Sequence, residues 1–309
     1  MYFRPHNRVK PGKSISNVGL IFLYTQNKQI RALGQYSMFF DQDRWRVAGE
    51  GGFEKFPNVF YGIGNDTRLE DEESFTNSYP FTSFSVMREI GANFFVGAVG
   101  LVERAKFTNF TDSGLLDMGL LTGSEGGFNW GIGPQILYDT RDNVYAPYRG
   151  CFFSVSSAFY YQKLGSSFNY TDLQIDLRYF VDLHQSHVLG IQFYSQLIFG
   201  EPPWYRLSQL GGDVIMRGFF EGRYRERRYM ALQTEWRFPI WNFVRGAAFV
   251  GAGDVANGFT DFQLNEFKYS GGLGLRLVLD PAERVNVRFD FGVGTGGVTG
   301  FYFQFAEAF

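Results

Sequence analysis

The stretch DVIMRGFFEGRYRERR, residues 213–228, is the part of the sequence best equipped to bind an anion. It holds five arginines, two glycines and two consecutive phenylalanines between segments that read as strands. Arginine binds carboxylates and phosphates through paired hydrogen bonds, so the stretch needs an anionic partner. The net charge of −2 and the lack of an accompanying aromatic platform disfavour a nucleic-acid partner.

Other motifs that could carry chemistry are weak. Residues 292–297 read GVGTGG, but a dinucleotide site needs a following helix and an acidic residue, and the chain ends in a strand instead. His184 and His187 form an HxxH pair that lacks further metal ligands and fits a solvated turn better. The single cysteine, Cys151, excludes an internal disulfide. We therefore expect no enzyme activity, no cofactor and no metal.

The elements that must position the arginines are strands. Phe, Tyr and Trp number 36, 18 and 5, which makes 19% of the chain aromatic, and glycine reaches 38. Mean hydropathy is −0.17, and the chain has no uninterrupted apolar run of the roughly 20 residues that a transmembrane helix needs. Barrel strands alternate, so a membrane barrel has the hydropathy of a soluble protein.

Apolar and polar residues alternate with period 2 in several segments: 172–179, 231–238, 273–279 and 285–291. A soluble β-sandwich also alternates. The polar faces of these segments are charged and mixed in sign, however, as in a crowded lumen, and aromatic residues mark strand ends, for example in 128–138. The pattern favours a membrane barrel over a sandwich.

The sequence predicts an all-β fold, a transmembrane antiparallel β-barrel of about 16 strands. Short and long connections alternate along the chain. The longest, about 200–227, is expected to be an extracellular loop that folds back into the lumen. We expect one barrel domain over 1–309. The expected strands are the extreme N-terminus, 29–40, 44–56, 58–65, 80–91, 93–107, 127–139, 150–162, 168–181, 187–199, 228–238, 243–253, 268–280, 284–294 and 299–309.

Several ordered motifs resemble one family of such barrels. They are 56-FPNVFYGIGNDT-67, 138-YDTRDNVYAPYRG-150, 210-LGGDVIMRGFFEGRYRERR-228, 232-LQTEWRFPIW-241 and 301-FYFQFAEAF-309. Together they resemble the Omp85 superfamily, also called the bacterial surface antigen family, whose members are BamA/TamA-like barrels. The resemblance covers most of the chain, and it is the order of the motifs that makes it specific.

The resemblance implies a role for the arginine stretch. The family's signature loop folds back into the lumen, and its arginine pairs with acidic residues on the following strands. Arg217 takes that place, and Glu235 matches the first acidic partner and faces the lumen by alternation. The signature itself falls on four consecutive residues: Met216, Arg217, Gly218 and Phe219.

The second acidic partner departs from the family pattern. The family's FxDxG motif should fall at 249–253, where Gly251 replaces the aspartate. Asp290, lumen-facing two strands later, is the candidate substitute. A buried guanidinium without a carboxylate is costly, so at least one partner is expected.

Two further expectations concern the ends of the chain. Family members usually carry POTRA domains before the barrel, whereas this chain starts its barrel almost at once, so we expect a barrel-only form without them. The last strand should form a weak seam with the first, and its alternating aromatics resemble the signal read by the outer-membrane assembly machinery. The seam and signal residues are Gly296, Gly297, Gly300, Phe301, Phe303, Phe305 and Phe309.

The resemblance implies a location in the bacterial outer membrane and a role in inserting or translocating polypeptides. The expected partners are outer-membrane lipid and lipopolysaccharide, with polypeptide substrates or another envelope protein as further candidates, and no nucleic acid. The alternative is an accessory or structural barrel that docks other envelope proteins or exports a co-encoded effector. A passive porin is disfavoured because the arginine loop should plug the lumen.

Overall fold

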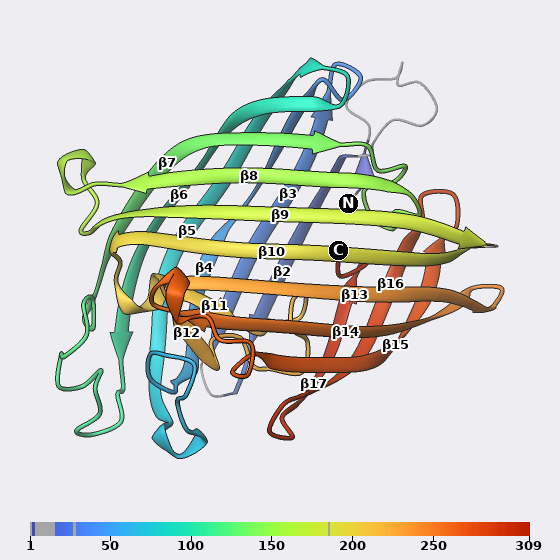
Figure 1. The fold of residues 1–309 in the computed structure, drawn as a ribbon. Coiled ribbons are helices and arrows are strands. Elements are labelled where there is room, and N and C mark those ends of the chain that lie inside the picture. Colours follow the sequence, from blue (N-terminus) through green and yellow to red (C-terminus); the bar gives the residue numbers. More distant parts are fainter. Residues whose placement is uncertain (1, 4–15, 27–28, 185) are drawn as a thin grey trace.

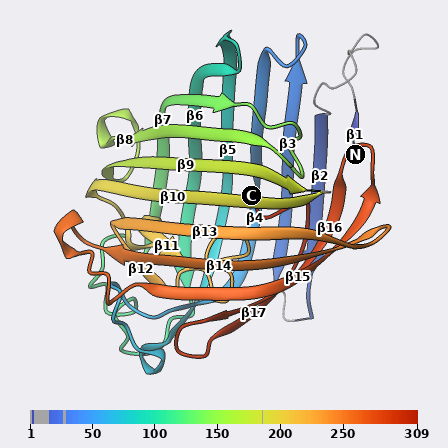
Figure 2. The same cartoon turned by 45° about the vertical axis from the view of Figure 1, so that its right-hand side comes forward.

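Consecutive strands pair as antiparallel neighbours in one strongly curved sheet (Figures 1 and 2). The computed structural model describes residues 2–3, 16–26, 29–184 and 186–309. Within these residues the main sheet has 15 strands. They are β1 (Tyr2–Phe3), β2 (Ser16–Tyr24), β3 (Ile30–Phe40), β4 (Trp45–Phe60), β5 (Glu73–Gly91), β6 (Phe94–Thr108), β7 (Gly126–Asp139), β8 (Gly150–Tyr160), β9 (Asn169–His184), β10 (His187–Glu201), β13 (Arg228–Trp241), β14 (Val244–Ala256), β15 (Lys268–Asp280), β16 (Val285–Gly294) and β17 (Thr299–Phe305).

The predicted all-β antiparallel architecture is confirmed. β10 pairs directly with β13, because β11 (Ser208–Leu210) and β12 (Tyr224–Glu226) form a separate hairpin. The helical segments are single 3-10 turns: η1 (Leu69–Asp71), η2 (Gln162–Leu164), η3 (Trp204–Arg206) and η4 (Phe259–Asp261). In the described part of the chain, no helix is long and apolar enough to cross a membrane.

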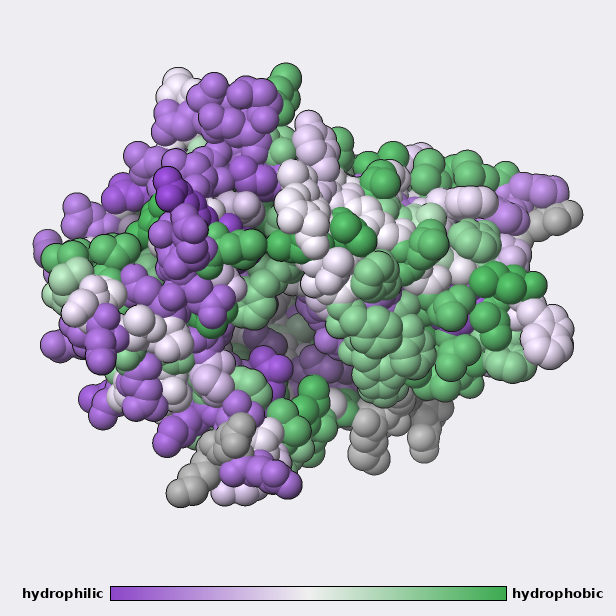
Figure 3. All heavy atoms as spheres, turned by 90° about the horizontal axis from the view of Figure 1, so that it is seen from below, coloured by the Kyte–Doolittle hydropathy of each residue, from purple (hydrophilic) through white to green (hydrophobic). Residues whose placement is uncertain are grey.

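Side chains alternate between the inside and the outside of the curved sheet. On β13, Gln233, Glu235 and Arg237 are buried, whereas Leu232 and Trp236 between them are exposed. This is the period that the sequence shows, with the charged face turned inward and the apolar face outward. Seen from below, hydrophilic side chains gather toward one side of the molecule and hydrophobic ones toward the other, with a hollow between them (Figure 3).

The connections differ at the two ends of the sheet. Short turns lie at one end, among them 41–44, 92–93, 242–243 and 281–284, and long connections lie at the other: 61–72, 109–125, 202–227 and 257–267. β4, β5 and β6 lie side by side in the back wall of the sheet, with β5 in the middle. β9, β10 and β13 form the front wall, and their direction is steeply inclined to that of the back-wall strands (Figure 1).

Several strand boundaries differ from the sequence-based expectation. The segment 58–65 is not a separate strand, because β4 continues to Phe60 and the chain then turns away. β5 starts at Glu73 rather than near residue 80, since it pairs with this extension of β4 along its length. At the end of the chain, β17 stops at Phe305 instead of reaching residue 309. Residues 4–15 of the expected N-terminal region lie outside the described residues.

Candidate functional site

The connection between β10 and β13 folds back against the inner side of the sheet. Its hairpin β11–β12 packs against β13 and β14 (Figure 1). Its tip carries the MRGF signature, and Met216, Arg217 and Phe219 are almost fully buried there. We call residues 202–227 the lumen loop.

Glycine at two positions of the lumen loop makes this path possible. Gly211 and Gly218 have φ values of +108° and +119°, in the region that residues with a side chain rarely adopt. A Cβ on Gly218 would lie 2.8 Å from the carbonyl carbon of Val293 on β16. The missing side chain therefore lets the loop tip lie directly on the backbone of β16.

Arg217 is held between two carboxylates on different strands. Its Nη2 lies 2.7 Å from Oε2 of Glu235 on β13, and its Nη1 lies 2.5 Å from Oδ2 of Asp290 on β16. Its guanidinium carbon also lies 3.6 Å from the ring centroid of Phe249 on β14. All three charged side chains are 0% exposed, so the ion pairs form away from water.

The two carboxylates also bind arginines from the strands themselves. Glu235 pairs with Arg237 at 2.7 Å and with Arg276 at 3.1 Å. Asp290 pairs with Arg276 at 2.5 Å and with Arg288 at 3.1 Å. Arg217 of the lumen loop thus joins a network of ion pairs formed by side chains of β13, β15 and β16.

These side chains form one buried group that we call the lumen ion cluster. It has four arginines and three carboxylates, so its formal charge is 4 − 3 = +1: Arg217, Arg237, Arg276, Arg288, Glu235, Asp290 and Glu307. Buried ion pairs roughly offset their desolvation cost, whereas removing one partner leaves a charge that is expensive to bury. The cluster therefore fixes where the loop lies more than it adds to net stability.

The place of the absent aspartate is filled by a side chain of the loop. A Cβ on Gly251 would lie 3.2 Å from Sδ of Met216 and 3.3 Å from Cβ of Gln233. Met216 therefore packs where a side chain at position 251 would start. Its neighbour Arg217 takes its second carboxylate from Asp290 instead.

Tyr302 on β17 is a contact that sequence reasoning missed. The backbone N–H of Gly218 donates to Oη of Tyr302 at 2.8 Å, and Tyr302 Oη donates to the carbonyl of Phe219 at 3.3 Å. Gly300 makes room for this phenol, because a Cβ there would lie 2.2 Å from the Tyr302 oxygen. The last strand thereby binds the signature backbone directly. No sequence motif singles out this tyrosine.

The C-terminal residues do not continue the strand, contrary to the expectation that the aromatic alternation runs to Phe309. Ala306 has a φ of +64° and turns the chain inward. Nε of Arg276 then lies 2.6 Å from Glu307, which joins the lumen ion cluster. Phe309 is buried against Phe180 of β9, with ring centroids 6.2 Å apart. Ion pairing of Glu307 and burial of Phe309 together explain the inward turn.

The glycines near the seam also differ from expectation. Gly296 and Gly297, expected among the seam residues of the last strand, lie instead in the turn between β16 and β17, with φ values of +84° and +79°. Their role is to permit that turn. The aromatic residues of β17 that follow remain on its exposed face: Phe301, Phe303 and Phe305.

The base of the lumen loop is held by aromatic rings. The ring centroid of Trp204 lies 5.0 to 5.1 Å from those of Phe60, Phe75 and Phe107. The guanidinium carbon of Arg225 lies 5.2 Å from the Phe60 ring and 5.1 Å from the Trp204 ring. Burial lowers the pKa of Arg225 to about 10. Aromatic rings therefore hold Arg225 at the base of the lumen loop, whereas carboxylates hold Arg217 at its tip.

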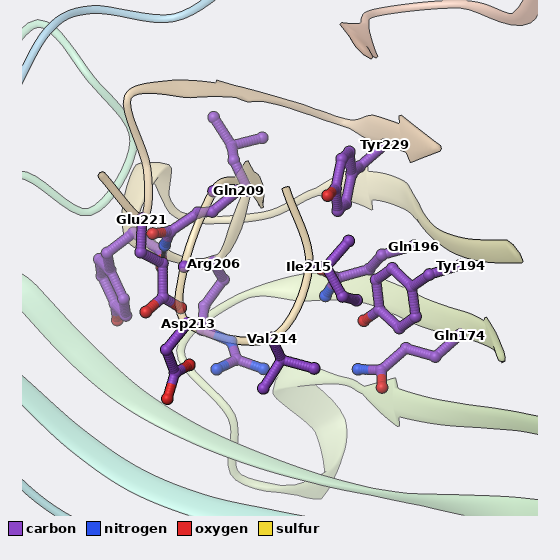
Figure 4. A pocket seen from close by; sticks show the side chains of 14 residues that line it. Gln174, Tyr194, Gln196, Arg206, Gln209, Asp213, Val214, Ile215, Glu221 and Tyr229 are labelled. Atoms are coloured by element: carbon purple, nitrogen blue, oxygen red, sulfur yellow. Dashed lines mark hydrogen bonds between the residues drawn. The ribbon is translucent and has the colours of Figure 1, made fainter. Parts of the chain in front are cut away.

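Two cavities flank the lumen loop. One, of about 410 Å³, lies toward β9 and β10 (Figure 4). The other, of about 920 Å³, lies toward β3 to β6. The smaller is lined mainly by amide, phenol and charged groups, among them Gln174, Gln196, Tyr194, Asp213 and Glu221. Burial and the nearby charge of Asp213 raise the pKa of Glu221.

No metal site appears among the residues that the structure describes, since no three His, Cys, Asp or Glu side chains group together there. His184 and His187 face each other across the β9–β10 connection, and His187 stacks on Trp236 with centroids 5.7 Å apart. The GVGTGG stretch ends β16 and enters a turn.

The geometry is that of an antiparallel, strongly curved sheet whose inner surface binds the lumen loop with its MRGF tip, and comparison with known families agrees with it. Residues 16–309 match the model of the Omp85 superfamily domain. The chain belongs to the Omp85 superfamily. No curated protein matches its sequence significantly.

Two solved structures resemble this Omp85 chain. BamA from Haemophilus ducreyi lacking POTRA domains 1–3 matches with a TM-score of 0.63 and 15% identity, covering 94% of this chain and 63% of that one. CdiB from Acinetobacter baumannii matches with a TM-score of 0.59 and 13% identity, covering 93% of this chain and 52% of that one. The chain therefore spans less than two thirds of the length of either structure, and the likeness supports the fold.

Proposed function

We propose that this Omp85 barrel lies in the bacterial outer membrane and assists the insertion of polypeptides into that membrane or their translocation across it. The long connections then face outward and the short turns face the periplasm. The observation that carries the proposal is a free strand edge. Unpaired edges offer backbone groups on which another strand can form.

The edge lies at the ends of the strand order, which runs from β1 to β17. No pairing joins these two ends within the described residues. Five consecutive residues of β2, from Leu20 to Tyr24, are exposed, and Leu20 and Phe22 reach 83% and 76%. Because successive side chains point to opposite faces, this pattern leaves both faces of β2 uncovered. An incoming strand would pair with the backbone N–H and C=O groups along this edge.

The lumen loop and the seam are physically linked. Tyr302 on β17 accepts the hydrogen bond from the Gly218 amide, and Nε2 of Gln304 donates to Asp213 of the loop at 2.6 Å. A displacement of β17 must therefore either break these hydrogen bonds or move the lumen loop with the strand. We propose that the lumen ion cluster, with Arg217 anchored on Glu235 and Asp290, holds the loop in place and thereby keeps β17 in its register with β16.

A second contact joins the two sides at the short-turn end. Nδ2 of Asn17 on β2 donates to Oη of Tyr145, and the amide of Glu307 beyond β17 donates to the carbonyl of Tyr145 at 3.2 Å. The turn 140–149 thus contacts both edges. A turn that holds both edges favours the second candidate, an accessory barrel that docks another envelope protein while its two ends stay in place.

Depletion of the chain in its host separates the two functions. Loss of an insertion factor lowers the amounts of other outer-membrane proteins, measured by quantitative mass spectrometry of the membrane fraction. An accessory barrel leaves those amounts unchanged and co-purifies with one defined partner. Unchanged amounts would therefore refute the proposed role in assembly.

A further inference from the structure

Three basic side chains lie together on the outward face of the back wall. Lys55 on β4, Ser78 on β5 and Lys106 on β6 form one row across the sheet. Arg104 lies two positions from Lys106 on the same strand, and all three basic residues are exposed. We call Lys55, Arg104 and Lys106 the basic patch.

The spacing allows the three cations to reach one ligand. Neighbouring strands are about 4.8 Å apart, so the backbones of Lys55 and Lys106 are roughly 10 Å apart, well within the combined reach of their side chains. Arg104 and Lys106 are separated by roughly 7 Å along β6. No carboxylate lies within ion-pair distance of any of them in the part of the chain that the structure describes.

On β4, β5 and β6, the outward-facing neighbours of the basic patch add hydroxyl groups and no acid, and the exposed Glu125 lies in the loop just before β7. The next row toward the long connections pairs Thr76 with Thr108, and Ser78 lies between the two lysines. The acidic residues beside the patch on β4 and β6, Glu54 and Glu103, have the opposite parity and are buried on the lumen side. The outward surface is therefore cationic and rich in hydrogen-bond donors.

Aromatic residues place the basic patch relative to a membrane. Phe128 on β7 is the register partner of Arg104, and Tyr138 is ten positions further along the same strand. Ten residues span about 34 Å, or about 26 Å along the membrane normal for a strand tilted by about 40°. An apolar band of about 25 Å bounded by aromatic rings is what such barrels present to lipid.

In the proposed orientation, with the long connections facing outward, the basic patch lies at the headgroup level of the outer leaflet. It begins in the row of Phe128 and continues one row beyond it, toward the long connections 61–72 and 109–125. At the other end of the band, Trp45 and Tyr138 mark the inner headgroup level, with Arg88 placed 5.4 Å from the Trp45 ring centroid.

We propose that the basic patch binds the phosphate groups of lipopolysaccharide, through its lipid A part, in the outer leaflet. This assignment rests on the proposed outer-membrane location. A glycolipid that carries phosphate groups supplies the anionic charge that the patch lacks, and its sugar hydroxyls suit Thr76, Ser78 and Thr108. Its acyl chains would then lie along the apolar band below the patch.

Binding of purified diphosphorylated lipid A to the detergent-solubilised barrel tests the proposal. The variant combines Lys55→Gln, Arg104→Gln and Lys106→Gln, and the matched control is Arg88→Gln, a lipid-facing arginine at the opposite end of the band. The triple variant is expected to bind about 100-fold more weakly, from a loss of three surface cations, while the control stays within about 2-fold of the wild type. Equal affinities of the triple variant and the wild type would overturn the proposal.

Two more arms make the result specific. Lipid A stripped of its phosphates should lose most of its affinity for the wild type; unchanged binding would show that acyl chains alone are recognised and would refute the assignment. Phosphatidylglycerol, with one phosphate and no sugar, should bind at least about 10-fold more weakly than lipid A. Equal binding would reassign the patch to phospholipid.

Two controls separate folding and function from binding. Heat-dependent gel mobility reports whether the triple variant is folded, and the single Lys106→Gln variant, expected to bind about 5-fold more weakly, replaces it if it is not. Lipid A binding that persists when depletion leaves outer-membrane protein amounts unchanged would refute the assembly role and keep this site.

Discussion

Replacing Arg217 with methionine should release the lumen loop at a moderate cost in stability. The variant removes two buried ion pairs and the contact with the Phe249 ring. Glu235 keeps its partners Arg237 and Arg276, however, and Asp290 keeps Arg276 and Arg288. The lumen ion cluster then has three arginines and three carboxylates. Since no carboxylate is left unpaired, the expected loss is about 1 to 2 kcal/mol, below the range for a change that leaves a buried charge without a partner.

Replacing Glu235 with glutamine should cost more, and the order of the two variants is the test. This change leaves four arginines with two carboxylates, a formal charge of 4 − 2 = +2, and removes one ion-pair partner from three arginines at once: Arg217, Arg237 and Arg276. The expected loss is about 5 kcal/mol. Both losses are measured by urea unfolding of the barrel in lipid vesicles. Equal losses, the reverse order or no change in Arg217→Met would refute the cluster as the anchor of the loop.

Three further predictions concern contacts at the seam and at the short-turn end of the sheet. Tyr302→Phe removes the acceptor for the loop amide and should cost about 1 to 2 kcal/mol while speeding hydrogen exchange of residues 216–219; unchanged exchange would count against the link between loop and last strand. Tyr145→Phe removes the acceptor for Asn17, so spin labels on β2 and β17 should show a broader distance distribution, and an unchanged distribution would contradict a clamp at this end. Burial alone would raise the pKa of Asp142, but hydrogen bonds led by that from Arg284 outweigh it and hold the pKa below its usual value. The stabilisation is therefore full above the unfolded pKa of about 4 and is lost as pH falls through the lower folded pKa, and Asp142→Asn should remove this part of the acid dependence of unfolding.

The sequence was sufficient for the fold and for the local placement of charged residues. The alternation in 231–238 assigns Glu235 to the lumen, and the alternation in 285–291 does the same for Asp290, because period 2 fixes the face of every residue in a strand. The structure then brings both side chains to Arg217. Periodicity cannot say which lumen-facing groups meet, since that depends on register and on the path of the loop.

The features that sequence reasoning missed depend on contacts between distant parts of the chain. Tyr302 alternates like its neighbours, and only the seating of the loop on β16 shows why its hydroxyl matters. The aromatic pattern of 301–309 continues beyond the end of β17. The last residues nevertheless turn inward, because Glu307 forms an ion pair with Arg276 on the inner side of the sheet. A pattern of alternating residues cannot reveal where pairing with a neighbouring strand stops.

The central claim is that the free edge of β2 receives polypeptide, and a photo-crosslinking amino acid at that edge tests it most directly. Leu20 lies on β2 beyond the two residues that pair with β1, while Leu232, which is also outward-facing and 55% exposed, lies on β13 between two paired neighbours. A photoreactive residue at 20 should form adducts with outer-membrane proteins in living cells, identified by mass spectrometry, and the same residue at 232 should form adducts with lipid alone. Polypeptide adducts at both positions, or at neither, would contradict the account.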